Sequence, residues 1–177
     1  CFDSPVITEE DLARTKTYAV ERKRRDLRSN AQSFHEWIHS LKTQVIVEDL
    51  NEANLPRAVQ LMNKTNQMNL SSRRMSEEEL CDWSSSDNRH LWTFRVADKF
   101  GDAGVTGLAS IQIEQESATI IDFVLSCRVI GRMVEETMLH FVTRVTDQLG
   151  VNNIIAEYVP TPNNNVCLSF WIERSGF

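Results

Sequence analysis

Apolar residues recur every three or four positions in several stretches of the chain, a spacing that predicts amphipathic helices. Thr8 precedes three acidic residues at 9–11, which is a signal for a helix start, and predicts a helix to about residue 28. Ser33 can cap a short second helix over residues 34–41. Further helices are predicted around residues 55–70, after Ser76 over 77–83, over 134–149 and over 165–177.

Between these helices the pattern changes to short runs rich in β-branched and aromatic residues, which predict strands. These runs lie at residues 43–50, 90–100, 104–115, 118–127 and 152–160. Only "GDAG" and "EQES" separate the middle three, so these strands are expected to form an antiparallel meander. The element order predicts an α+β fold with a mostly antiparallel central sheet flanked by helices. We interpret residues 1–42 as a linker and helical appendage, and residues 43–177 as the main domain.

Composition narrows the classes of function. The 177 residues include 41% hydrophobic side chains and carry a formal net charge of −6, which disfavours nucleic acid and anionic membranes as partners. No apolar stretch approaches the roughly 18 to 20 residues that span a bilayer, and no signal-peptide pattern opens the sequence. The sequence therefore predicts a cytoplasmic protein.

The cysteines give no sign of a metal site. Four occur, and they lie far apart without the paired spacing of zinc ligands: Cys1, Cys81, Cys127 and Cys167. Without a secretory signal they are expected to be free thiols in a reducing compartment. The sequence thus predicts no bound metal.

A glycine between two arginines marks the point where an apolar run gives way to the helix predicted at 134–149. Backbone N–H groups at a helix start can bind an anion, and glycine allows it to come close. The residues predicted to contact such a ligand are Leu125, Ser126, Arg128, Val129, Gly131 and Arg132. In the alternative interpretation the arginines are ordinary surface residues and the glycine serves packing.

The element order around this loop resembles the GNAT acyltransferase fold. The GNAT phosphate-binding loop has Arg or Gln, two residues, Gly, one residue, then Gly or Ala; Arg128 and Gly131 match, while Met133 replaces the small residue. The resemblance implies that the loop holds phosphate and that the open edge of the preceding strand pairs with pantetheine amides. Because of Met133, we expect no tightly bound cofactor: CoA would bind weakly, and a carrier-protein phosphopantetheine arm, with one phosphate, fits better.

Five segments resemble, in order, the C-terminal half of FkbH-like proteins of polyketide assembly lines. They are "RTKTYAVERKRRDLR", "QLMNKTNQMNL" with "SSRR", "DKFGDAGVTG", "IDFVLSCRVIGR" and "YVPTPNN". The resemblance implies a preceding HAD-type half, related to phosphatases, and joint loading of a glyceryl unit from a bisphosphoglycerate onto an acyl carrier protein. The Asp-x-Asp motif of a HAD half does not occur in this sequence, and residues 2–10 are interpreted as the linker out of that half.

Cys127 is the candidate catalytic residue. It lies beside Arg128 and just before a predicted helix start, two features that favour a thiolate. As a nucleophile it could carry the acyl group as a thioester and so divide one transfer into two. The alternative is an inert buried cysteine, which is common.

Amide side chains gather in "NKTNQMNL", where the helix predicted around 55–70 should pass into a loop. One interpretation is turn chemistry, and the other is a polar pocket in which Asn66, Gln67 and Asn69 bind the hydroxyls of an acyl unit. Arg73 and Arg74 would then assist with a substrate carboxylate or phosphate, or else lie on the surface.

The first predicted helix carries a basic cluster in "ERKRRDLR". Helical spacing places Arg24 and Arg28 on one face, and we interpret them as a docking surface for an acidic carrier protein. The alternatives are a solvated helix face and a contact with the HAD half.

These features lead to three hypotheses. The first is an acyl-transfer and carrier-docking domain of an FkbH-like loading enzyme, and the second is a non-catalytic scaffold that binds the carrier protein. The third is an acetyl-CoA-dependent N-acetyltransferase. It is disfavoured because such enzymes often use a tyrosine four residues before the last glycine, where this chain has Ile172.

Overall fold

The computed structural model describes residues 9–177, with side chains from residue 19 onward. The cap predicted at Thr8, Cys1 and the first residues of the predicted linker lie outside the described residues. The chain divides into two compact units. One contains the described residues up to Gln44 together with Ala97–Asp102, and the other contains Val45–Val96 and Ala103–Phe177.

The first unit contains two helices, α1 (Glu9–Asn30) and α2 (Phe34–Leu41). The predicted cap of α2 is confirmed, because the Ser33 hydroxyl accepts a hydrogen bond of 3.1 Å from the N–H of Glu36. The helix ends at Lys42, whose backbone adopts the left-handed conformation with φ of 52°.

A six-stranded sheet forms the centre of the second unit, with strand order β1-β3-β4-β5-β2 and β6 also paired with β5. Short turns join β3 to β4 and β4 to β5, so the predicted meander and α+β class are confirmed. The strands are β1 (Gln44–Asp49), β2 (Met68–Asn69), β3 (Arg89–Asp98), β4 (Gly101–Glu114), β5 (Ser117–Leu125) and β6 (Asn153–Ala156).

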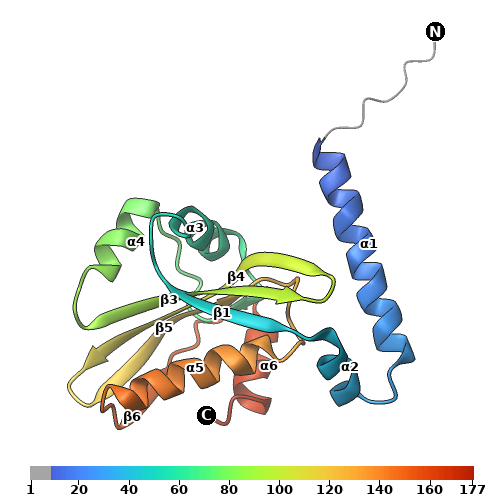
Figure 1. The fold of residues 1–177 in the computed structure, drawn as a ribbon. Coiled ribbons are helices and arrows are strands. Elements are labelled where there is room, and N and C mark those ends of the chain that lie inside the picture. Colours follow the sequence, from blue (N-terminus) through green and yellow to red (C-terminus); the bar gives the residue numbers. More distant parts are fainter. Residues whose placement is uncertain (1–8) are drawn as a thin grey trace. The chain divides into compact units, whose positions relative to one another are not determined.

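Helices cover both faces of this sheet (Figure 1). One face packs against α3 (Leu55–Lys64) and α4 (Glu77–Ser84), and the other against α5 (Val134–Gln148) and α6 (Asn165–Glu173). The period of two along β5 explains the division, because Phe123 and Leu125 enter the core beneath α5 and α6 while Val124 enters the core beneath α3 and α4.

Several element boundaries differ from those predicted; the GDAG segment predicted as a turn, for example, belongs to β4, which begins at Gly101. The helix predicted around residues 55–70 ends at Lys64, because Met68 and Leu70 are fully buried and their segment joins the sheet as β2. The last strand is shorter than the predicted 152–160, and α6 ends at Glu173 rather than at the end of the chain. Tertiary packing decides these ends, whereas sequence periodicity only locates the elements.

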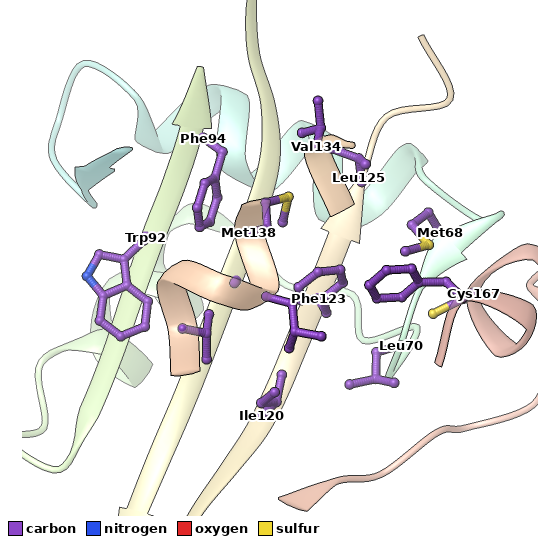
Figure 2. Packing of buried hydrophobic residues seen from close by; sticks show 14 of the residues in the cluster. Met68, Leu70, Trp92, Phe94, Ile120, Phe123, Leu125, Val134, Met138 and Cys167 are labelled. Atoms are coloured by element: carbon purple, nitrogen blue, oxygen red, sulfur yellow. The ribbon is translucent and has the colours of Figure 1, made fainter. Parts of the chain in front are cut away.

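The packing of the core around α5 depends on a glycine in β4, Gly107. Met138 of α5 is fully buried near Phe94, as Figure 2 shows. A Cβ atom added at Gly107 would lie 2.8 Å from the Met138 sulfur and 3.1 Å from the Phe94 Cβ. The glycine therefore leaves the space that the methionine fills.

We predict that Gly107→Ala lowers the free energy of unfolding by about 1–3 kcal/mol, because the added methyl group overpacks this site. Urea unfolding followed by circular dichroism measures the change. In a double mutant with Met138→Val, which removes the contacting sulfur, the loss should be smaller than the sum of the two single losses. Additive losses would contradict this explanation.

Candidate functional site

A cleft of about 310 Å³ lies where α3 and the connection after it meet the C-terminal end of β5. It brings together four residues that the sequence predicted as site residues, Asn66, Gln67, Ser126 and Cys127. The full lining is Arg57, Gln60, Leu61, Lys64, Thr65, Asn66, Gln67, Ser126 and Cys127. This is the candidate functional site.

Cys127 presents an exposed, free thiol at the edge of the cleft. The strand before it fixes its position, because the N–H of Ser126 donates a hydrogen bond of 2.8 Å to the Thr106 carbonyl of β4. The Nε of Arg128, the next residue, lies 3.4 Å from the Ser126 hydroxyl. The thiol is thus held by the sheet and open to a reactant, as a nucleophile requires.

Two cations in the cleft were missed by the sequence analysis: Arg57 in the first turn of α3 and Lys64 in its last. The Arg57 guanidinium donates from Nε to the Val105 carbonyl at 3.0 Å and from Nη1 to Gln60. Desolvation lowers the pKa of Arg57, and the positive charge of Arg128 lowers it further. The sequence pattern predicts that Arg57 lies on a helix, but it does not show that the end of β5 lies opposite that part of the helix.

The amides at the rim are partly fixed by other side chains. The side-chain amide oxygen of Asn66 accepts a hydrogen bond of 2.6 Å from Arg74, whose guanidinium also donates to the backbone carbonyl of Met62 near the end of α3. Arg74 therefore positions Asn66 and the helix end, and the substrate contact predicted for it stays a prediction. Asn66 and Gln67 line the cleft, and their role in binding an acyl unit stays a prediction.

Asn69 and Arg73 serve the fold where the sequence predicted substrate contacts. Asn69 is fully buried, and its amide donates to the Thr65 carbonyl and accepts from the Ser72 N–H, which is the turn chemistry of the alternative interpretation. The Arg73 guanidinium binds both oxygens of buried Asp122, at 3.1 and 2.6 Å. Its donors are therefore committed to the core of the domain.

The strand edge that was expected to be open for pantetheine is filled by the chain itself. Residues of β2 pair antiparallel with the end of β5, Met68 opposite Leu125, and the Leu70 N–H donates to the Phe123 carbonyl at 3.1 Å. The start of the same edge pairs in parallel with β6. The expectation of an open edge is therefore wrong, because backbone groups of residues 68–70 occupy it.

Residues before and within α6 hold β2 in place. The Asn164 side chain donates to the carbonyls of Asn69 and Val159, and it accepts from the Tyr158 hydroxyl at 2.6 Å and from the Thr161 N–H at 2.8 Å. The N–H of Cys167 donates to the Gln67 carbonyl. Figure 2 shows Met68, Leu70 and Cys167 beside Phe123, so the segment is part of the core.

The predicted phosphate loop is also occupied from within. The Gly131 N–H donates to the Glu135 carboxylate at 2.7 Å, and this side chain is 1% exposed. Desolvation raises the pKa of Glu135. A buried acid at the start of α5, which also pairs with Arg174 at 3.6 Å, thus takes a donor that an incoming phosphate would need.

Other residues predicted to contact the ligand in this loop are turned into the protein. Leu125 and Val129 are fully buried, and Arg132 is 8% exposed and donates to the Arg128 carbonyl at 2.5 Å. Met133 adopts a left-handed backbone with φ of 64° as the N-cap residue of α5. Of the predicted loop, Ser126 lines the cleft and Arg128 is exposed, and the binding of an anion by these residues stays a prediction.

The basic residues Arg24 and Arg28 face their own unit. Arg24 binds the Asp98 carboxylate through Nε at 2.7 Å and also pairs with Glu21, and the Arg28 guanidinium lies 5.1 Å from the Trp37 ring centroid. Desolvation acts to lower the pKa of Arg24, but the Asp98 charge and hydrogen bonds outweigh it and the pKa is raised. Arg24 is thus engaged within its own unit, whereas Arg28 is exposed, and the docking of a carrier protein at these residues stays a prediction.

Solved structures match this chain in fold. An acetyltransferase from Trypanosoma brucei matches with a TM-score of 0.52 and 14% identity, over 76% of this chain and 92% of that one. An aminoglycoside acetyltransferase from an uncultured soil metagenomic sample matches with a TM-score of 0.52 and 14% identity, over 75% and 88%. A Mycobacterium tuberculosis protein crystallised with CoA matches with a TM-score of 0.50 and 13% identity, over 62% of this chain and 61% of that one. No protein-family model and no curated protein sequence matches.

The chain therefore has the GNAT acetyltransferase fold, as its element order predicted. At these identities the likeness concerns the fold alone, and the FkbH-like context, the carrier protein and the HAD half stay predictions. Among the helices that the structure describes, none is both long and apolar enough to cross a membrane. In the same part of the chain, no cluster of three or more His, Cys, Asp or Glu side chains could hold a metal ion.

We predict that CoA binds this chain more weakly than micromolar, and that Glu135→Gln strengthens binding about fivefold, because a neutral amide oxygen holds the Gly131 N–H less strongly than a carboxylate does. Isothermal titration calorimetry measures both values. Glu157→Gln, at an exposed acid after β6, removes the same charge elsewhere and should leave the affinity unchanged. Micromolar binding by the unmodified chain would contradict the occupied loop.

Proposed function

We propose that this chain is an acyl-transfer domain in which the thiol of Cys127 accepts the acyl group in the cleft. The observation that carries the proposal is the exposed thiol at the end of β5, in a cleft lined by cationic and amide side chains. The Cys127 thiolate attacks the carbonyl carbon of a donor thioester, a new S–C bond forms, and the donor's thiolate leaves and takes up a proton. The acceptor's thiol then attacks the enzyme thioester and releases Cys127.

The class of donor is inferred from the fold and from the two cofactor contacts that the chain's own residues already take. Acetyltransferases of this fold and a neighbour crystallised with CoA support a thioester of the pantetheine type. In this chain β2 covers the edge of β5, and Glu135 takes the loop N–H. Both contacts favour a partner that contributes binding energy outside the cleft, as a carrier protein with a phosphopantetheine arm does. This is the basis for proposing an FkbH-like loading role together with a HAD-type half.

A second candidate is direct acetyl transfer from CoA to an amine, and the fold of the structural neighbours favours it. In that reaction the amine attacks the thioester itself and no protein thiol is needed. Dependence on Cys127 therefore separates the two candidates. Acyl transfer of either kind separates both candidates from a scaffold that binds a carrier without chemistry.

We predict that the chain, incubated with acetyl-CoA or with an acylated carrier protein, gains the mass of one acyl group at Cys127. Intact-mass spectrometry and peptide mapping locate the label, and hydroxylamine should remove it as a thioester. Cys127→Ser should lower labelling at least about 100-fold, because the hydroxyl is a far weaker nucleophile. Cys81→Ser, at the exposed thiol of α4, is the matched control and should keep full labelling.

The donor that labels faster identifies the natural class of thioester. Amine acetylation at an unchanged rate in Cys127→Ser would overturn the thioester relay in favour of direct transfer. If Cys127→Ser and Cys81→Ser both bind the carrier protein and neither is labelled, only the hypothesis of a non-catalytic scaffold remains.

A further inference from the structure

The cleft is cationic in a protein that is negative overall. The chain has a formal net charge of −6, yet Arg57 and Lys64 line the cleft and, among the described residues, no carboxylate does. Lys64 is exposed and forms no ion pair within the described part of the chain. Charge of one sign in a concave site raises the local concentration of ligands of the opposite sign.

Arg57 is held in one orientation. Its Nε and Nη1 donate to Val105 and Gln60, which leaves Nη2 without a hydrogen-bond partner among the described residues. A guanidinium fixed in this way loses little further entropy when it binds an oxyanion. The protein contacts thus orient the group and leave part of its donor set unused.

Arg128 adds a second positive charge beside Arg57. Its charge is close enough to lower the pKa of Arg57, and its own hydrogen bond is a long contact of 3.4 Å with the Ser126 hydroxyl. Two adjacent cations repel each other, and an anion between them removes that repulsion. Arg128 follows Cys127 in the sequence, and Arg57 lines the cleft together with Cys127.

We propose that the cleft selects a small acyl substrate that itself carries an oxyanion, a carboxylate or a phosphate, which binds Arg57 and Arg128 while its carbonyl carbon faces the Cys127 sulfur. This inference rests on the proposed function for the reacting carbonyl and goes beyond it in naming the charge of the substrate. A volume of about 310 Å³ is at the low end for small-molecule sites and suits an acyl group of a few carbons.

Alkylation of the cysteines tests the charge of the site without any acyl transfer. Iodoacetate and iodoacetamide react with the same thiolate, forming an S–C bond and releasing iodide, so their rate ratio reports the local field. Cys81 is an internal reference, because it is exposed on α4 among the acids Glu77, Glu78 and Asp82. Peptide mapping by mass spectrometry at two salt concentrations gives both rates for both thiols.

We expect the iodoacetate to iodoacetamide ratio at Cys127 to exceed that at Cys81 at least about fivefold at low salt. Arg57→Gln should lower the Cys127 ratio at least about threefold. Arg144→Gln, at an exposed arginine of α5, removes the same charge elsewhere and should leave it unchanged. Equal ratios at the two cysteines, or equal effects of the two variants, would overturn the inference.

Protection experiments distinguish the two oxyanions. Succinate or inorganic phosphate at matched ionic strength should slow the reaction of Cys127 with iodoacetamide, and neutral succinamide should not. The anion with the stronger effect identifies the class, and protection by neither anion would overturn the inference. If the site around Cys127 proves cationic and anions protect the thiol from alkylation, but Cys127 never accepts an acyl group, the proposed function fails and this inference stands. If Cys127 accepts an acyl group at a rate that Arg57→Gln does not change, this inference fails and the proposed function stands.

Discussion

The pairing of β2 with the end of β5 is the constraint on which the site depends. One edge of β5 pairs in parallel with β6 at its start and antiparallel with β2 at its end, so residues 68–70 occupy the part of the edge that β6 leaves. Because the helix α3 must end before this segment, its last turn and the residues after it lie against the end of β5. The cleft and its lining follow from that placement.

Much of the fold could be predicted from local pattern, and the filled edge could not. The meander is visible in the runs of β-branched and aromatic residues of β3, β4 and β5 and in the short polar segments near their ends, and the cap of α2 is visible in Ser33. Met68 and Leu70 continue the helical spacing of the residues before them, so only the partner strand and Asn164, far along the sequence, reveal a strand there.

The difference between local pattern and distant contacts also explains which site residues could be predicted and which could not. Cys127, Asn66 and Gln67 were found because a thiol at a strand end and a cluster of amides are unusual locally, and the structure brings them to one cleft. Arg57 carries no local signal, and Arg73 looked available because its partner, Asp122, is distant in sequence. Composition indicates which side chains can bind a ligand, but only tertiary contacts show which are already engaged.

The full engagement of Asn164 has an evolutionary consequence. Its amide makes four hydrogen bonds, one of them to the backbone of Asn69, so the segment that fills the β5 edge is stabilised by a side chain nearly a hundred positions away. A lineage that reopens this groove has to lose both the buried β2 segment and its asparagine support. Because the hydrogen bond to Asn69 reaches its backbone carbonyl, the support depends on the side chain at position 164 and not on the one at position 69, so replacement of Asn164 in descendants of this chain would mark the loss of that support.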